Sequence, residues 1–217
     1  MDFNQQVINQ TKGFLDAGEG RALYDFSLTA AKMGPCLEIG SYCGKSTVYI
    51  GTACKKQDTT LFSIDHHRGS EEQQPGELYF DPALIDPRTF HGDTLFEFRN
   101  TLRAAALEQH VVPLVCDSSV AAKSWRTPLS LVFIDGGHAL ETVKADYNHW
   151  AKHVVTSGYL IFHDVFEDPK DGGQAPYTIY SAAISSGGFA EAARVGSLGV
   201  LQRVSLESGS ALGTGHV

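Results

Sequence analysis

Short apolar runs alternate along the chain with longer stretches whose apolar residues recur at helical spacing. The runs with the length of buried strands are 36–40, 61–65, 111–116, 129–134 and 159–162. The stretches between them that favour helices are 44–54, 94–108, 119–125 and 139–154. Strands that alternate with helices indicate a parallel sheet covered by helices on both faces.

The two ends of the chain add to this core. Residues 1–33 predict two helices, over 3–14 and 19–31, and a further helix is expected over 177–186. Residues 190–195 and 199–204 are typical of a closing antiparallel hairpin. We therefore expect one doubly wound, mostly parallel α/β sheet of the Rossmann-like kind with a C-terminal antiparallel hairpin. It forms a single domain over 1–206, and the Gly- and Ser-rich tail 207–217 is expected to be disordered.

The least regular stretch is residues 66–92, which we call the lid segment. It contains Pro75, Pro82 and Pro87 together with many polar residues, so a long helix or strand is excluded. Tyr79 and Leu84 are among the residues that give it something to bury. A long irregular stretch inside a compact domain is usually functional or disordered, and we expect a partly ordered lid.

Composition excludes several classes of function. The 217 residues carry a formal net charge of −8 at pH 7, which opposes binding to nucleic acid or to an acidic membrane surface. No apolar run is long enough to span a bilayer, and the first ten residues lack a signal-peptide pattern. The four cysteines form no C-x-x-C pair. These features predict a reduced, cytoplasmic protein; a homodimer is an open option.

The segment from Pro35 to Thr47 follows the first strand with a glycine loop and a helix start. Three patterns compete for it. A phosphate loop needs four residues between Gly and Gly-Lys-Ser/Thr, but Gly40 and Gly44 enclose three. A dinucleotide fingerprint needs glycine where Tyr42 stands. The E-x-G-x-x-x-G loop of S-adenosylmethionine (SAM) enzymes fits, and a plain strand-to-helix turn is the alternative without function.

Acidic or metal-binding residues stand at the carboxyl ends of the predicted strands. In chain order they are Glu38, Asp65, Asp117, Asp135, His163 and Asp164. In an open α/β sheet these strand ends meet at one edge, where ligands bind. An acid at position 65 can accept hydrogen bonds from ribose hydroxyls, and Asp117 with Ser118 could reach an adenine amino group.

Asp135, His163 and Asp164 suggest a metal site, because carboxylate and imidazole ligands from two neighbouring strands can share one divalent ion. This set suits Mg²⁺, Mn²⁺ or Fe²⁺ better than zinc. A helix-capping Asp with a solvated His-Asp pair is the alternative. His138, three residues after Asp135, is placed to act as a general base.

These motifs together resemble the class I SAM-dependent methyltransferases. The residues that carry the resemblance are LEIGSYCGKST, FSID, VCDSS and LVFIDGGHALETVKADYNHW followed by GYLIFHD, within Glu19 to Val204. They look like the small-molecule branch described as a type 24 methyltransferase domain, and like its metal-dependent O-methyltransferases. That family usually has an acidic residue where this chain has His163.

The resemblance implies methyl transfer from SAM to a hydroxyl of a small molecule, assisted by a divalent metal, most simply Mg²⁺ or Mn²⁺. His138 would be the catalytic base, and Asp135, His163 and Asp164 the metal ligands. The candidate cofactor-binding residues are Glu38, Gly40, Ser41, Tyr42, Gly44, Ser46, Asp65, His66, Asp117, Ser118 and Asp135.

Candidate contacts to the acceptor are His66, His67, Arg68 and Tyr177. Two alternatives to this function stay open. One is a phosphate-loop-like nucleoside-triphosphatase, suggested by Gly44-Lys45-Ser46. The other is a SAM-binding protein without catalysis.

Overall fold

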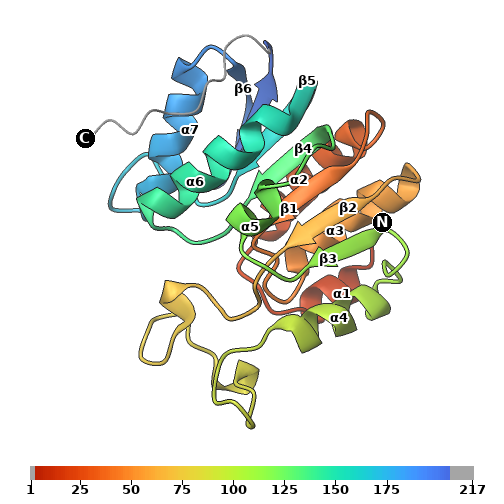
Figure 1. Ribbon diagram of the computed structural model, residues 1–217, viewed down its shortest axis with the longest axis vertical. Coiled ribbons are helices and arrows are strands. Elements are labelled where there is room, and N and C mark those ends of the chain that lie inside the picture. The colour runs from red at the N-terminus through yellow and green to blue at the C-terminus, as the bar shows by residue number, and fades with distance from the viewer. Residues whose placement is uncertain (1–2, 206–217) are drawn as a thin grey trace.

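The computed structural model describes residues 3–205, and in it seven strands form one sheet in the order β3-β2-β1-β4-β5-β7-β6 (Figure 1). The first five strands run parallel, and β7 lies antiparallel between β5 and β6. This confirms the predicted doubly wound sheet with its C-terminal hairpin. The strand bounds are β1 Cys36–Ile39, β2 Leu61–Ile64, β3 Val111–Leu114, β4 Leu129–Ile134, β5 Val154–Phe162, β6 Phe189–Val195 and β7 Leu198–Arg203.

Helices cover both faces of the sheet (Figure 1). One face packs against α1 (Gln5–Gln10), α2 (Ala17–Ala30), α3 (Lys45–Lys56) and α4 (Leu95–Ala104), and the other against α5 (Ser118–Ala122), α6 (Leu140–Trp150) and α7 (Ala175–Ser185). Three short 3-10 helices complete the described elements: η1 (Glu71–Gln73), η2 (Pro82–Leu84) and η3 (Ala151–His153). Two buried apolar clusters, one on each face, hold the layers together.

The register of the sheet brings the ends of its strands to one level. Ile39 pairs with Ile64 on one side and Ile134 on the other, and Ile134 pairs with Phe162. The residues that follow these partners, which are Gly40, Asp65, Asp135 and His163, therefore stand side by side along one edge. This alignment follows from parallel pairing alone and gives the candidate site its position.

The first helix is shorter than predicted. It ends at Gln10 instead of Phe14, because Gly13 takes a φ of 152° and Asp16 starts the next helix. The side chain of Asp16 accepts from the helix, and Glu19 bonds back to the backbone of Asp16, which together form a capping box. The loop between the two helices lies against α3, where Lys45 Nζ donates to the carbonyl of Gly13 over 2.8 Å.

Strand β5 is longer than predicted and begins at Val154 instead of Tyr159. Gly158, predicted as a turn, lies within this strand next to Ser157, which has a φ of 67°. The pairing with β4 shifts at this point, so the irregularity is a bulge. A Cβ on Gly158 would lie 2.7 Å from the carbonyl oxygen of Ser130, which explains the glycine.

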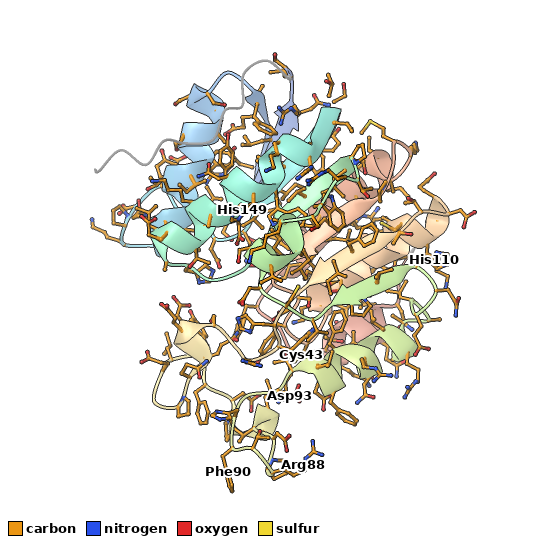
Figure 2. The ribbon with its side chains drawn as sticks, in the orientation of Figure 1. Cys43, Arg88, Phe90, Asp93, His110 and His149 are labelled. Atoms are coloured by element: carbon orange, nitrogen blue, oxygen red, sulfur yellow. The ribbon has the colours of Figure 1, made fainter. Side chains whose placement is uncertain are left out.

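The lid segment leaves the sheet after β2 and projects from the edge where the parallel strands end (Figure 1). It contains η1 and η2, and Ile85 bridges to Gly92. Arg88 and Phe90 lie at its outer tip, away from the sheet (Figure 2). The segment forms no long helix or strand, as predicted, and its role as a lid stays a prediction. The predicted disordered tail lies outside the described residues. Among residues 3–205, no helix has the length and apolar character needed to cross a membrane.

Candidate functional site

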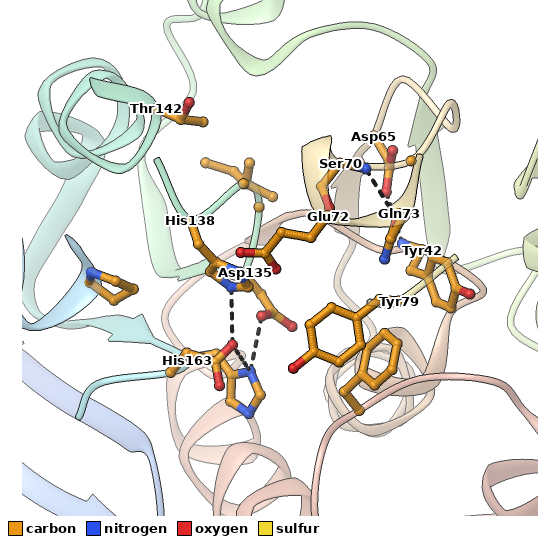
Figure 3. A pocket seen from close by; sticks show the side chains of 18 of the residues that line it. Tyr42, Asp65, Ser70, Glu72, Gln73, Tyr79, Asp135, His138, Thr142 and His163 are labelled. Carbon is orange, nitrogen blue, oxygen red and sulfur yellow. Dashed lines mark hydrogen bonds and ion pairs between the residues drawn. The ribbon is translucent and has the colours of Figure 1, made fainter. Parts of the chain in front are cut away.

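A cavity of about 1500 Å³ runs along the carboxyl edge of the strands (Figure 3). It exceeds the roughly 300–1,000 Å³ of an ordinary small-molecule pocket, so two ligands could lie in it together. Most of the predicted site residues line it, namely Gly40, Ser41, Tyr42, Ser46, Asp65, His66, Asp117, Ser118, Asp135, His138, His163 and Asp164. The register of the sheet accounts for this convergence.

The glycine loop forms one wall of the cavity. Gly40 has a φ of 86°, and a Cβ there would lie 2.1 Å from the carbonyl oxygen of Asp135, so no larger residue fits. Gly44, with a φ of 95°, is the N-cap of α3. Ser41 is 2% exposed, lines the cavity, and its hydroxyl has no partner. Unpaired N–H groups at the helix start and this hydroxyl are suited to hold a carboxylate.

Glu38 and Gly44 were predicted as cofactor contacts, but the structure places both outside the cavity lining. Glu38 is fully buried and accepts hydrogen bonds from the hydroxyls of Ser46, Thr47 and Ser63 over 2.6–2.8 Å. Burial raises the pKa of Glu38 to about 7. Its carboxyl group holds the first turn of α3 through Ser46 and Thr47. Glu38 therefore stabilises the glycine loop without lining the cavity.

Asp65 joins β2 to the glycine loop. Its Oδ2 accepts from the backbone N–H groups of Ser41 and Tyr42 over 3.0 and 2.8 Å, and its Oδ1 accepts from that of His67 over 2.7 Å. A carboxylate can accept about four hydrogen bonds, so room remains for a ligand hydroxyl. The position level with Gly40 fits the predicted contact to ribose.

Ser118 and its partner Asp146 form the wall beside α5 and α6. The Ser118 hydroxyl donates to a carboxylate oxygen of Asp146 in a short hydrogen bond. Burial raises the pKa of Asp146 to about 6. Sequence analysis missed Asp146, which lies inside a helix and at no strand end. Asp117 starts α5 without a side-chain cap, so its carboxylate faces the cavity uncommitted to the helix.

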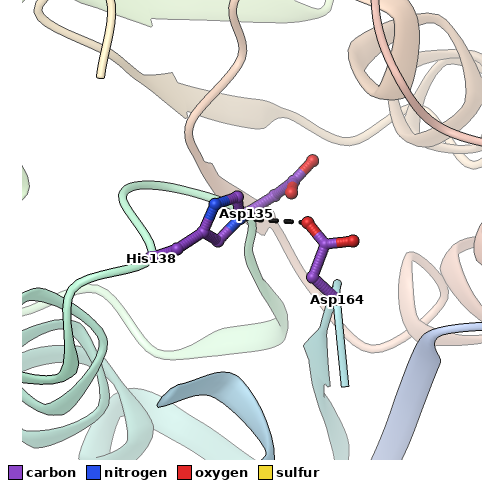
Figure 4. Close-up of side chains that lie close together, drawn as sticks. All are labelled: Asp135, His138 and Asp164. Carbon is purple, nitrogen blue, oxygen red and sulfur yellow. Dashed lines mark ion pairs between the residues drawn. The ribbon is translucent and has the colours of Figure 1, made fainter. Parts of the chain in front are cut away.

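Ligand atoms of Asp135, His138 and Asp164 all lie within 4.8 Å of one another (Figure 4). His138 Nε2 is 3.0 Å from Asp164 Oδ2. Asp164 is the second residue after β5, and its φ of 55° is a left-handed conformation that few residues other than glycine adopt. Two carboxylates and an imidazole at this spacing match the donor set of a hard divalent cation.

The surroundings of His138 favour its charged form. The hydrogen bond to Asp164 raises the pKa of His138 to about 9, since it outweighs burial and is reinforced by Glu72. Glu72 Oε2 lies 3.0 Å from His138 Nδ1. Burial would raise the pKa of Asp164, but its contacts with His138 and His163 lower it well below its usual range.

His163, predicted as a metal ligand, is placed differently from the two aspartates. Its Nδ1 lies 3.0 Å from Asp135 Oδ1 and its Nε2 3.1 Å from Glu19 Oε2. Burial would lower the pKa of His163, but the carboxylates of Asp135, Asp164 and Glu19 raise it well above its usual value. The group of ligand atoms that lie within 4.8 Å of one another contains His138 and not His163. The role of His163 as a metal ligand stays a prediction.

The predicted acceptor contacts separate into two sets. His66 lines the cavity, whereas His67 is buried with Nδ1 2.8 Å from Thr94 Oγ1. Arg68 is exposed outside the cavity lining, and Tyr177 packs against the core cluster beside α7. The aromatic residues that do line the cavity are Phe14, Tyr42, Tyr79 and Phe166.

A family profile described as a methyltransferase domain matches residues 37–165. The chain belongs to this family. The matched range includes the glycine loop, Asp65 and the group formed by Asp135, His138 and Asp164. The assignment goes against a nucleoside-triphosphatase, and Lys45, which such an enzyme would direct at phosphates, bonds to Gly13.

Solved structures share the fold. A protein from Klebsiella pneumoniae, provisionally described as an O-methyltransferase, is 16% identical with a TM-score of 0.64 and covers 93% of this chain and 89% of its own. An O-methyltransferase from Bacillus cereus in complex with SAH is 16% identical, with a TM-score of 0.61. The match covers 92% of this chain and 88% of the Bacillus cereus chain. The O-methyltransferase TomG from Streptomyces achromogenes, involved in tomaymycin synthesis and solved with SAM, is 15% identical, with a TM-score of 0.61 and coverage of 88% and 82%.

Proposed function

We propose that this protein transfers the methyl group of SAM to a hydroxyl group of a small molecule, assisted by a divalent cation such as Mg²⁺ or Mn²⁺. One observation carries the proposal: a single cavity joins the glycine loop at Gly40 to the group formed by Asp135, His138 and Asp164. A methyl donor on the loop and an acceptor beside the aspartates would then meet within one enclosure.

The loop side of the cavity suits SAM. The first turn of α3, where Lys45 and Ser46 line the cavity, and the buried Ser41 hydroxyl would take its carboxylate, and Asp65 its ribose hydroxyls. Asp117 and Ser118 lie on the β3 side of Asp65, where the adenine would extend. The SAM and SAH complexes of proteins with the same fold support this placement.

In the reaction, the acceptor oxygen forms a bond to the methyl carbon while the bond from that carbon to sulfur breaks, and SAH leaves. The hydroxyl proton passes to Nε2 of His138, which borders the same space as Asp135 and Asp164. A cation held by the two aspartates would lower the pKa of the acceptor hydroxyl. It would also offset the carboxylate charge that otherwise keeps His138 protonated.

The charge of the cavity limits the acceptor. Glu72, Glu77 and Asp171 line the cavity in addition to the aspartates at the strand ends. Lys12 and Lys45 are the lysines among the described lining residues; Lys12 pairs with Asp81, and Lys45 bonds to Gly13. No arginine of the described chain lines the cavity. A phosphate-bearing acceptor, such as a coenzyme A thioester, would meet mainly like charge, so we propose a neutral or cationic acceptor.

The shape of the entrance favours a flat acceptor. Phe14 lies between two tyrosine rings, with centroids 5.0 Å from Tyr79 and 5.8 Å from Tyr42. These rings come from the loop before α2, the lid segment and the glycine loop. An aromatic acceptor could pack against this group of rings in the offset or edge-on geometry that such rings prefer.

The test is an assay with labelled SAM and a library of phenols, aromatic amines bearing hydroxyls, and coenzyme A thioesters, each with Mg²⁺ or with EDTA. We expect methylated product from neutral or cationic phenols, with Mg²⁺ only. Tight SAM binding without transfer to any acceptor would favour the non-catalytic alternative. If product forms equally well with EDTA, the methyl transfer does not depend on a divalent cation, and that part of the proposal is wrong.

A further inference from the structure

Glu72 is the residue of the lid segment that reaches into the group around His138. It lies on η1, and its side chain extends from there toward the imidazole (Figure 3). Its Oε2 is 3.0 Å from His138 Nδ1, across 66 positions of sequence. The Glu72 side chain is 45% exposed, so it stands at the rim of the cavity and is reachable from solvent.

The contact has a consequence for the other ring nitrogen. A carboxylate on Nδ1 requires a proton there, because the carboxylate only accepts hydrogen bonds. In the neutral ring the lone pair must then sit on Nε2. His138 Nε2 is the atom that faces Asp164 and the space shared with Asp135. Because Nε2 itself lies 3.0 Å from Asp164 Oδ2, both ring nitrogens face carboxylates. A cation held by Asp164 would leave Glu72 as the carboxylate partner of the ring, with the proton on Nδ1 and the lone pair on Nε2.

We propose that Glu72 is a positioning residue that holds His138 in the tautomer and orientation required for proton transfer, and that it does so only while the lid segment is closed. The inference rests on the proposed function, in which His138 takes the acceptor proton. A base oriented by a third group is a general arrangement in enzymes, and here that group sits on a separate segment. Closure of the lid segment would therefore also orient His138 as the base.

The lid segment is built to hold η1 in place. Ser70 and Gln73 form a capping box at η1, in which the backbone N–H of Ser70 donates to Gln73 Oε1 over 3.0 Å. Gln74 Nε2 donates to the carbonyl of Ser70 over 2.9 Å. Lys12 pairs with Asp81, in the middle of the lid segment at the start of η2. These contacts fix the backbone of Glu72 without involving its side chain, which is left to His138.

The experiment compares Glu72→Ala, Glu72→Gln and the matched control Glu71→Gln, from the same turn. The readouts are kcat and KM for the best acceptor at saturating SAM and Mg²⁺, together with ¹⁵N signals of the His138 ring in the SAH complex. We expect Glu72→Ala to lower kcat about 10- to 100-fold, with KM and SAM affinity unchanged. The Glu72→Gln variant should recover most of the rate, because its side-chain amide oxygen still accepts from Nδ1–H.

The ring signals separate this inference from the proposed function. With SAH and Mg²⁺ bound, wild type and Glu72→Gln should show the Nδ1-protonated tautomer, and Glu72→Ala a mixture of both tautomers, even if no acceptor is methylated. Unchanged kcat and unchanged ring signals in Glu72→Ala would overturn the inference. A decrease of kcat in Glu71→Gln as large as that in Glu72→Ala would also overturn it. A failure to find any acceptor would count against the proposed function, while the ring signals would still decide the role of Glu72.

Discussion

Glu19 Oε2 lies 3.1 Å from His163 Nε2 and joins the start of α2 to the end of β5, across 144 positions of sequence. The other Glu19 oxygen, Oε1, accepts from the backbone and hydroxyl of Ser197 over 2.6 and 2.9 Å. Both partners of the ion pair are nearly inaccessible to solvent. Glu19 and His163 thus connect the N-terminal helices, the strand ends and the hairpin behind the cavity, and His163 holds Asp135 in turn.

Removing the charge of Glu19 should destabilise the fold. Glu19→Gln leaves the buried imidazolium of His163 with one carboxylate fewer, and we expect the free energy of unfolding at neutral pH to fall by about 3 kcal/mol. Urea denaturation in EDTA measures this. Asp25→Asn, in an exposed pair with Arg21 on the same helix, is the control and should change stability by less than about 1 kcal/mol. Equal stability of Glu19→Gln and wild type would contradict the role given to this pair.

The same residue should contribute to acid unfolding. Burial would raise the pKa of Glu19, but hydrogen bonds from His163 and Ser197 lower it from 4.5 to about 2. A lowered pKa stabilises the fold above the unfolded-state value, and this contribution is lost as pH falls from 4.5 toward 2. Wild type should therefore lose stability over this range more steeply than Glu19→Gln. Parallel curves for the two proteins would show that Glu19 is not the group responsible.

Asp65→Ala should weaken SAM binding. The change removes a charged acceptor from the predicted ribose contact and also frees the N–H groups of Ser41 and Tyr42, so a loss of about 1.5–3 kcal/mol is expected. Calorimetric titration with SAM measures it. Glu108→Ala, an exposed carboxylate on the connection to β3, serves as control. Wild-type affinity in Asp65→Ala would reject the assignment of the ribose site.

Lys12→Met should loosen the lid segment. The variant loses the pair with Asp81, which holds the lid against the loop before α2. Hydrogen exchange of amides in residues 70–88 should become faster, and SAM with acceptor should restore part of the protection. Arg88→Met breaks a pair with Asp86 that lies within the lid itself and should leave exchange outside the lid tip unchanged. Identical exchange in Lys12→Met and wild type would show that the lid is held by its other contacts.

His138 and Asp164 should fail in different ways when replaced. His138→Ala should keep its affinity for Mn²⁺ and SAM but lose roughly 10²–10⁴-fold in rate, and this loss should shrink at high pH as the acceptor ionises unaided. Asp164→Ala should lose Mn²⁺ affinity and most of the rate, yet still bind SAM. If His138→Ala loses Mn²⁺ as well, then His138 is a metal ligand and not the base.

The parts of the site that could be predicted are those imposed by parallel pairing. Asp65 and Asp135 directly follow buried strands. Because the last residues of these strands pair with Ile39, the last residue of β1, both aspartates lie at the same edge of the sheet as Gly40. Short apolar runs followed by an acid are visible in sequence, and no distant contact is needed to align them.

The parts that could not be predicted depend on segments that meet only in the folded chain. Glu19 looks like an ordinary first-turn helix residue, and Glu72 like one of several lid carboxylates. Their contacts with His163 and His138 come from tertiary packing, which no local sequence pattern shows. Tyr177 shows the converse, because it is a predicted acceptor contact, but its side chain packs against the core cluster and does not line the cavity.

The most direct test of the account is a crystal structure of the protein with SAH and Mn²⁺, with anomalous data at the manganese edge. We expect one anomalous peak bound by oxygens of Asp135 and Asp164, beside His138 Nε2, and SAH along the Gly40 loop with its ribose on Asp65. A cavity that binds SAH but shows no manganese peak between the two aspartates would contradict metal-assisted methyl transfer by this protein.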